Sequence, residues 1–327
     1  MKKACFIVPY FGQFPNYFQL FLRSCSINKD YQWLIITDNK EKYSYPKNVK
    51  KIDMSFQQLR EKFQDKFDFS ICLNTPRKLC DYKPAYGYIF EDYIHDYPYW
   101  GHCDIDTIIG KLNDFLPELI SKKYDKIFTL GHFVLYKNTF ENNRTFMKQF
   151  QGRKLYKESF TTDKITVFDE TYGNKNNVNS IFISNKKEVF QEDYSYNIYI
   201  NRTTFQQIKY LYKTNTYILG EKLKYNIFVW SSNGLSQIKM CNNKVVNTKI
   251  MYLHLQQRKM RIKKDISKYY DFVIIPNLFY GIEKVPKNIS EYKKLKKGNF
   301  SFHKERIFIK WKIHGLKKRL IKKSRRL

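Results

Sequence analysis

The sequence predicts an α/β fold in which a mixed, mostly parallel β-sheet is flanked by helices. Three observations support this class. Short apolar runs typical of buried strands alternate with runs of helical spacing through the first third of the chain. Hydrophobic residues make up 43% of the 327 residues, which is enough for a substantial core. No run of about 18 uncharged apolar residues occurs, so no transmembrane helix is expected.

The expected elements follow one another from the N-terminus. Strands are expected at 5–9, 33–38, 50–54 and within 126–137, and helices at 15–26, 56–63, 80–92 and 113–122. In the first helix Phe18, Phe21, Leu22 and Cys25 share one face, and Ser55 is expected to cap the second helix. The polar stretch 152–179 is expected to be rich in loops. Strand-like runs return at 225–230, 250–255 and 272–275.

The cysteines indicate the redox environment. The six cysteines include no Cys-x-x-Cys pair. Neither a zinc site nor a disulfide framework is therefore expected, and a reducing cytoplasm fits this usage.

Two aspartates end the aromatic, strand-like run that begins at Tyr99. Residues i and i+2 of a strand point to the same face, so Asp104 and Asp106 are expected to project together from a strand end. Two close carboxylates are unfavourable unless a cation lies between them. The pair therefore indicates a Mg²⁺ or Mn²⁺ site shared with substrate phosphates. The alternative is a solvated turn, in which such triplets also occur.

A metal bound by two carboxylates needs further ligands, and histidine is a common one. In the alternating run 251–256, Tyr252 and His254 share one face, so His254 is a candidate ligand. His132 is a second candidate for a role in the cleft. A surface position or a purely structural hydrogen bond is the alternative for each histidine.

An ordered set of short motifs resembles the nucleotide-sugar glycosyltransferases of the GT-A fold. More closely, it resembles a poorly characterised group of bacterial proteins from capsule and lipopolysaccharide gene clusters. The motifs span about residues 1–280 and comprise 7–12 (IVPYFG), 36–38 (ITD), 80–87 (CDYKPAYG), 100–106 (WGHCDID), 131–133 (GHF), 168–170 (FDE) and 253–256 (LHLQ). In one respect the chain differs from many such enzymes, because Asp81-Tyr82-Lys83 stands where they carry an Asp-x-x-Arg run.

The resemblance implies roles for individual residues. Asp104, Asp106 and His254 match the residues that hold Mn²⁺ or Mg²⁺ on the diphosphate of the donor. The end of the first strand, Pro9, Tyr10 and Phe11, is expected to line the nucleotide pocket together with His132. Further donor contacts are expected from Asp38, to the base or ribose, and from Lys83, to ribose or phosphate. The alternative for Lys83 is a solvated position on a helix.

Asp169 and Glu170 are the candidate catalytic residues. In inverting GT-A enzymes a carboxylate about this far beyond the metal motif often deprotonates the acceptor hydroxyl, and a carboxylate near a metal site can perform that step. The alternative is that the pair caps a helix or only holds the acceptor. The sequence leaves open whether the anomeric configuration is inverted or retained.

The net charge of +30 is concentrated near the C-terminus. Residues 284–327 hold 17 Lys and Arg against two Glu, so this segment carries 17 − 2 = +15. The spacing of Ile309, Ile313, Leu316 and Leu320 predicts a basic amphipathic helix on an anionic membrane surface. Packing of this stripe on the body, a disordered tail and nucleic-acid binding are the alternatives. The expected organisation is a glycosyltransferase domain at 1–283 and a basic tail at 284–327.

These features together predict a metal-dependent glycosyltransferase. Its donor is expected to be a nucleotide sugar and its acceptor a lipid-linked or polysaccharide chain of a capsule or lipopolysaccharide. The expected location is cytoplasmic and peripheral, on the inner face of the bacterial plasma membrane, with no nucleic-acid partner. The charge and the acidic pair leave a nucleic-acid-binding protein or metal-dependent nuclease as the main alternative. A non-catalytic assembly factor at the membrane is a third possibility.

Overall fold

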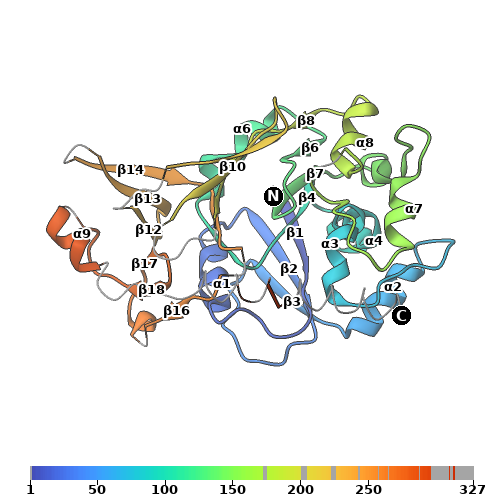
Figure 1. Cartoon of the computed structure of the whole chain (residues 1–327). Helices are drawn as coiled ribbons and strands as arrows, with labels where there is room; N and C mark the ends of the chain where they lie inside the picture. The colour runs from blue at the N-terminus through green and yellow to red at the C-terminus, as the bar shows by residue number, and fades with distance from the viewer. Residues whose placement is uncertain are drawn as a thin grey trace.

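The computed structural model describes residues 2–171, 175–199, 205–221, 226–241, 244–256, 258–263, 265–286, 288–295, 309 and 312–313. These residues form three β-sheets with helices packed around them (Figure 1). In Figure 1 the six-stranded sheet lies on the left, strands β1 to β3 lie in the middle, and helices α3, α4 and α7 lie on the right. The predicted α/β class is confirmed.

The first sheet has seven strands in the order β3-β2-β1-β4-β7-β6-β8. Its strands are β1 (Ala4–Pro9), β2 (Tyr31–Thr37), β3 (Val49–Asp53), β4 (Tyr99–Cys103), β6 (Lys126–Ile127), β7 (Phe133–Lys137) and β8 (Val189–Phe190). The first four run parallel, whereas β7 pairs antiparallel with both β4 and β6. The carboxyl ends of β1 to β4 therefore meet at one edge of the sheet.

Strand β1 shows why this sheet is buried on both faces. Its alternate residues enter two separate cores: Cys5 and Ile7 pack on one side, and Ala4, Phe6 and Val8 pack on the other. Helix α1 (Phe18–Ser26) packs into the second core through Phe18, Phe21, Leu22 and Cys25, the face that the sequence predicts. A continuous apolar strand is expected where helices cover both faces of a parallel sheet.

Helix α2 (Phe56–Gln64) begins where the sequence predicts. Ser55 accepts a hydrogen bond from the backbone N–H of Gln58, and the Gln58 side chain accepts one from the backbone N–H of Ser55. This reciprocal capping box satisfies two donors that the first turn leaves unpaired.

The prediction of one long helix at 80–92 is wrong. The chain forms a series of short helical pieces instead: η1 (Pro76–Lys78), α3 (Leu79–Tyr82), η2 (Lys83–Ala85), α4 (Tyr86–Ile89) and α5 (Glu91–Ile94). Pro84 has no backbone N–H to continue an α-helical ladder, and its ring disfavours the preceding turn. Gly87 packs directly against the Trp100 ring, where a Cβ would lie 2.1 Å from the indole.

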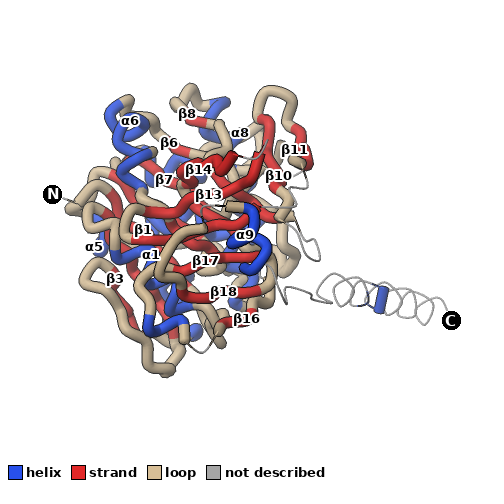
Figure 2. The backbone as a smooth tube through the Cα atoms, turned by 90° about the vertical axis from the view of Figure 1, so that its left-hand side faces the viewer, coloured by secondary structure: helices blue, strands red, loops and turns tan. Residues whose placement is uncertain are grey.

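Two further sheets are built mostly from the second half of the chain. The five-stranded sheet has the order β11 (Thr216–Leu219), β10 (Gln207–Leu211), β9 (Ser195–Ile198), β15 (Tyr252–His254) and β5 (Thr107–Ile109). The six-stranded sheet has the order β14 (Lys244–Ile250), β13 (Gly234–Cys241), β12 (Asn226–Ser231), β17 (Phe272–Ile275), β18 (Leu278–Gly281) and β16 (Arg261–Ile262). Figure 2 shows β13, β17, β18 and β16 one above the other.

Strands β12, β15 and β17 confirm the three strand-like runs that the sequence predicts, whereas the strands around them were not predicted. Strand β5 links the five-stranded sheet to the first sheet, because it follows β4 in the chain and pairs with β15.

Shorter helices complete the fold. They are η3 (Leu112–Asp114), α6 (Leu116–Ser121), η4 (Asn142–Met147), α7 (Leu155–Phe160), α8 (Val178–Ser184), η5 (Ile266–Lys268) and α9 (Ile289–Leu295). The helix predicted at 113–122 is thus divided between η3 and α6, and the predicted loop region 152–179 includes α7.

Within the described ranges, none of the helices has the length and apolar character needed to cross a bilayer. Most of the predicted amphipathic tail lies outside the described residues. Ile309 and Ile313, which are described, are exposed.

Candidate metal and substrate site

Asp104 and Asp106 lie in the turn that joins β4 to β5. The sequence predicts that both project from a strand end, and β4 does end at Cys103, but both aspartates lie in the turn, so the strand periodicity on which the prediction rested does not apply to them. The turn is fixed on both sides: the backbone N–H of Asp104 donates to the carbonyl of His132 (3.0 Å), and that of Leu255 donates to the carbonyl of Asp106 (2.9 Å). These bonds connect the turn to β7 and β15, so the two carboxylates are held by long-range contacts rather than by strand periodicity.

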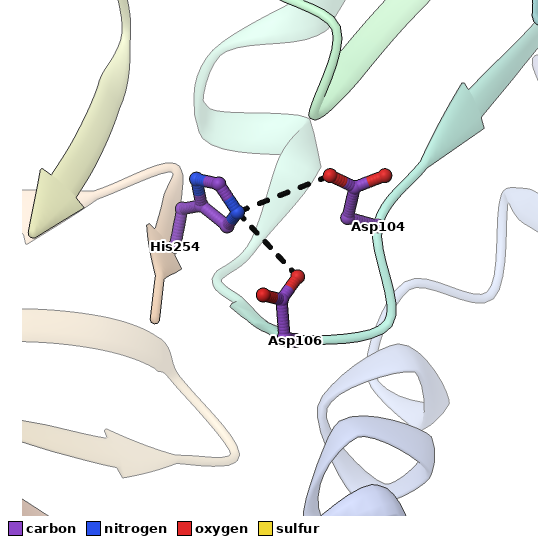
Figure 3. Close-up of side chains that lie close together, drawn as sticks. All are labelled: Asp104, Asp106 and His254. Atoms are coloured by element: carbon purple, nitrogen blue, oxygen red, sulfur yellow. Dashed lines mark ion pairs between the residues drawn. The ribbon is translucent and has the colours of Figure 1, made fainter. Parts of the chain in front are cut away.

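The third member of the cluster, His254, is brought to the turn by strand pairing. In the β15–β5 ladder His254 lies opposite Thr107, the residue that follows Asp106. Its Nε2 atom lies 3.4 Å from Asp106 Oδ1 and 3.9 Å from Asp104 Oδ2 (Figure 3). One ligand atom from each of the three side chains lies within 4.8 Å of the other two, so the cluster can hold a metal ion.

The neighbouring strand β9 sets the orientation of the His254 ring. Nδ1 lies 3.0 Å from Asn197 Oδ1, which also accepts a hydrogen bond from Gln256 Nε2 (2.8 Å). An amide oxygen can only accept, so Nδ1 donates its proton to Asn197, and Nε2 is the ring nitrogen that faces the two carboxylates. Such a second partner is typical of a metal-binding histidine.

The two aspartates also control the charge of His254. Burial alone would lower the pKa of His254, but the negative charges of Asp106 and Asp104 outweigh burial and raise it. A divalent cation bound here would take the place of the proton on Nε2, because only the neutral ring offers a lone pair. Two carboxylates and one imidazole form a donor set that suits Mn²⁺, and the carboxylates alone suit Mg²⁺.

His132 lies directly behind His254. The two ring centroids are 4.4 Å apart, and His132 Nδ1 lies 2.7 Å from the hydroxyl oxygen of Tyr252. Burial, with the nearby charges of His254 and Lys83, lowers the pKa of His132 well below its usual value, so this ring is neutral. It is almost fully buried and supports the face of His254.

Lys83 connects the metal cluster to the second acidic pair. Its ammonium group donates to Asp104 Oδ1 and to the carbonyl of Gly131, both at 2.8 Å, and lies 3.6 Å from Asp169 Oδ2. Burial opposes the charge, but Asp104 and Asp169 hold the pKa of Lys83 well above its usual value. The alternative of a solvated helix position is therefore wrong, and Lys83 is a fixed internal cation.

Asp169 and Glu170 have different surroundings. Asp169 is 4% exposed, and burial, opposed by Lys83 but assisted by Glu170, raises its pKa to about 8. Glu170 is partly exposed and accepts a hydrogen bond from the backbone N–H of Gly131 (2.9 Å). A Cβ at Gly131 would lie 2.4 Å from Asp169 Oδ2, so this close approach requires glycine. Among the helices that the structure describes, none is capped by either carboxylate, so the helix-cap alternative finds no support there.

A buried ion pair that the sequence did not identify supports this second pair. Asp81 is fully buried and accepts from Lys78 Nζ (2.6 Å) and from the backbone N–H groups of Thr166 and Phe168 (3.0 Å each). Lys78 also donates to the carbonyl of Lys164 (2.5 Å). The two side chains thus fix the segment that ends at Asp169. Their spacing of three residues is the only signal in the sequence, and it is equally typical of a solvated helix surface.

Of the residues predicted to contact the donor nucleotide, Pro9, Tyr10, Phe11 and Asp38 lie at the carboxyl ends of β1 and β2. Asp38 Oδ1 accepts a hydrogen bond from the backbone N–H of Gly12 (3.2 Å) and so ties the two strand ends together. Tyr10 lies near the metal cluster: burial and the charges of Asp106 and Asp104 raise its pKa. Phe11 packs on Phe56 in the core, and Pro9 is the last residue of β1.

The site therefore brings together Asp104, Asp106, His254, His132, Lys83 and Asp169, with Glu170 and Tyr10 beside them. Residues 6–283 match a family described as a family of unknown function, DUF6625. The match covers 278 of the 327 residues (283 − 6 + 1 = 278), so the chain belongs to this family. No curated protein matches the chain.

Proposed function

We propose that this DUF6625 member is a metal-dependent glycosyltransferase that moves a sugar from a nucleotide-sugar donor to a growing surface polysaccharide of the capsule or lipopolysaccharide type. The observation that carries the proposal is the convergence of Asp104, Asp106 and His254 Nε2 at the carboxyl edge of parallel strands. In open α/β sheets this edge is where ligands bind. A resident Mn²⁺ or Mg²⁺ at these three residues would neutralise the charge that develops on a diphosphate leaving group.

The chain's own residues supply the remaining requirements of the donor site. Lys83 is a permanent cation beside Asp104 and keeps one carboxylate oxygen of Asp104 occupied, which leaves Oδ2 directed at His254. Tyr10 and the linked strand ends at Gly12 and Asp38 form the adjoining surface, which we assign to the nucleoside.

Transfer breaks the bond between the anomeric carbon and the diphosphate, which leaves with the electron pair. The acceptor oxygen forms the new bond, and its proton must pass to a base. Of the two carboxylates, the partly exposed Glu170 is the better candidate for contact with the acceptor. Buried Asp169 is assigned to holding Lys83. We therefore expect Glu170→Gln to lower transfer while leaving Mn²⁺ binding unchanged.

The basic segment 284–327 supports a location on the inner face of the bacterial plasma membrane, where its charge of +15 would attract anionic lipid. Flotation with anionic and neutral vesicles tests this location. Equal binding of the full chain to both vesicle types would contradict it.

The test of the proposed function is turnover of UDP-, GDP- and CMP-sugars with Mn²⁺, Mg²⁺ or a chelator. We expect slow release of free sugar from at least one donor with Mn²⁺, none with chelator, and none from Asp106→Asn. An absence of metal-dependent turnover and binding across the panel would overturn the proposal. Metal-dependent cleavage of RNA or DNA by the same protein would favour a nuclease instead.

A further inference from the structure

A second concave surface lies away from the metal cluster. It is a groove of about 630 Å³, formed by β2, the edge strand β3 with the segment before it, and α5 with the segment after it. This volume falls within the range of ligand sites in proteins. Gln32 is the second residue of β2, Val49 is the first of β3, and Tyr97 lies two residues before β4. The groove is therefore at the amino ends of the parallel strands, whereas the metal cluster is at their carboxyl ends.

Three tyrosines, Tyr45, Tyr93 and Tyr97, line this groove. Each is partly buried and packs against one of the two cores of the first sheet. Their rings are thus fixed by the core while they border an open groove. Rigid aromatic rings of this kind provide contact area with little loss of conformational entropy on binding.

The polar groups of the groove favour a negatively charged ligand. Lys47 and Lys50 line it and are exposed, and within the described ranges neither forms an ion pair. The one acidic lining residue, Asp92, lies 4.0 Å from Lys62, which partly offsets its charge. The Gln32 side chain adds an amide donor and acceptor.

We propose that this groove binds an acidic saccharide chain. Tyrosine rings pack on the apolar faces of sugar rings, Gln32 and Asp92 suit hydroxyl groups, and Lys47 and Lys50 suit carboxylate or phosphate substituents. The identification of this saccharide as the growing acceptor polymer rests on the proposed glycosyl transfer, whereas saccharide binding itself does not.

The position of the groove fits a polymer rather than the sugar that is transferred. Six residues of extended chain separate Gln32 from Asp38 along β2, which corresponds to about 20 Å. A ligand in the groove is therefore remote from the metal cluster. The groove would hold a part of the acceptor already synthesised, while the end of the chain to be extended lies at the metal cluster.

A single-stranded nucleic acid is the other polyanion that binds to aromatic and basic groups. Its recognition requires a positive groove that follows one phosphate per nucleotide. Two lysines opposed by Asp92 do not supply such a track. A saccharide, with hydroxyl groups and fewer charges, matches this composition better.

The test measures binding of size-graded hyaluronan oligosaccharides to the full chain by calorimetry, with malto-oligosaccharides as neutral probes and oligothymidylate as the nucleic-acid probe. We expect saturable binding of hyaluronan. The double variant Lys47→Glu/Lys50→Glu should weaken it by about tenfold, and Tyr97→Ala by at least as much. The matched control is the double variant Lys42→Glu/Lys213→Glu, which reverses two lysine charges on exposed residues outside the groove.

Absence of hyaluronan binding, an equal effect of Lys42→Glu/Lys213→Glu and of the groove double variant, or tighter groove-dependent binding of oligothymidylate would overturn the proposal. Thermal melting of every variant confirms that it is folded. Asp106→Asn separates the two proposals, because it should abolish nucleotide-sugar turnover and leave hyaluronan binding intact. Failure of glycosyl transfer would appear as no turnover with groove binding intact. Failure of the groove would appear as turnover without groove-dependent binding.

Discussion

Two pairs of carboxylates lie on either side of Lys83, and different groups neutralise them. Asp169 and Glu170, the second acidic pair, are held by the ammonium group of Lys83 and by the backbone of Gly131. Asp104 and Asp106, the first acidic pair, share Lys83 on one side and face His254 Nε2 on the other.

The two pairs therefore differ in what offsets their negative charge. The first acidic pair can bind a cation, whereas groups of the protein already offset the charge of the second. The first acidic pair brings two carboxylates and an imidazole together, so a proton on His254 or a divalent cation must offset its charge. In the second acidic pair, burial raises the pKa of Asp169, but the charge of Lys83 opposes this rise, so the protein itself offsets the charge of the pair. Similar residues therefore have different roles because their surroundings differ.

The largest expected effect is on the stabilisation of the protein by Mn²⁺, and it should differ between the two acidic pairs. Asp106→Asn removes one of the three metal ligands, so we expect the stabilisation of the protein by Mn²⁺ to disappear in thermal melting. Asp169→Asn should retain it. Asp65→Asn, an exposed position on the end of α2, is the control. Equal loss of the Mn²⁺ response in Asp106→Asn and Asp169→Asn would show that the two pairs are not distinct.

The next largest effect concerns the support of the second acidic pair. Asp81→Asn leaves Lys78 buried without its counter-ion, and breaking a buried ion pair costs about 3–5 kcal/mol. We expect a loss of this size in the free energy of unfolding by urea, with Mn²⁺ affinity unchanged in the folded variant. A loss below about 1 kcal/mol would contradict the account of this ion pair.

The burial of Asp169 predicts a pH effect of smaller size. Its pKa is raised from 3.8 to about 8, so between these values the folded protein binds a proton that the unfolded chain has lost. Stability should therefore fall as the pH rises through this window, by up to about 1.4 kcal/mol per pH unit.

Asp169→Asn removes this contribution and should be less sensitive to pH. Urea unfolding at pH 6 and pH 8 is the measurement. If the wild-type protein and the variant lose the same free energy of unfolding between the two pH values, Asp169 is already ionised in the folded protein.

The smallest expected effect concerns the partner of His254. Asn197→Ala removes the acceptor at Nδ1, and loss of such a partner lowers metal affinity by about tenfold. Asn197→Asp keeps an acceptor and should retain the affinity. Calorimetric titration with Mn²⁺ measures both variants. Equal affinity in the wild-type protein and in Asn197→Ala would show that the hydrogen bond does not orient the ring for metal binding.

The sequence predicts those parts of the fold that local patterns determine. The apolar runs of β1 and β2, the apolar face of α1 and the cap at Ser55 appear in the structure as expected. Strand β14 could not be found in this way, because its residues Lys244–Lys249 are all exposed and show no alternation of burial. The break of the predicted helix at Pro84 has a local cause that the sequence contains, because proline has no backbone N–H. The packing of Gly87 against Trp100 is a tertiary contact, which no local pattern contains.

The residues of the candidate site likewise fall into those that the sequence predicted and those that it did not. Asp104, Asp106 and His254 could be selected from residue type and order, but they meet because β5 pairs with β15, which places His254 opposite Thr107, 147 residues earlier in the chain (254 − 107 = 147). Lys78 and Asp81 were missed because only burial distinguishes their ion pair from a solvated one. The sequence thus identifies candidate residues by their chemistry, but it does not reveal which of them are buried or which distant strands pair.

Anomalous scattering from crystals grown with Mn²⁺ and a nucleoside diphosphate tests the central claim most directly. We expect one strong peak between Asp104, Asp106 and His254 Nε2, at metal–ligand distances, with the diphosphate bound to the same ion and no peak at Asp169 and Glu170. A peak at the second acidic pair, or no peak at either pair in crystals that contain the diphosphate, would contradict it.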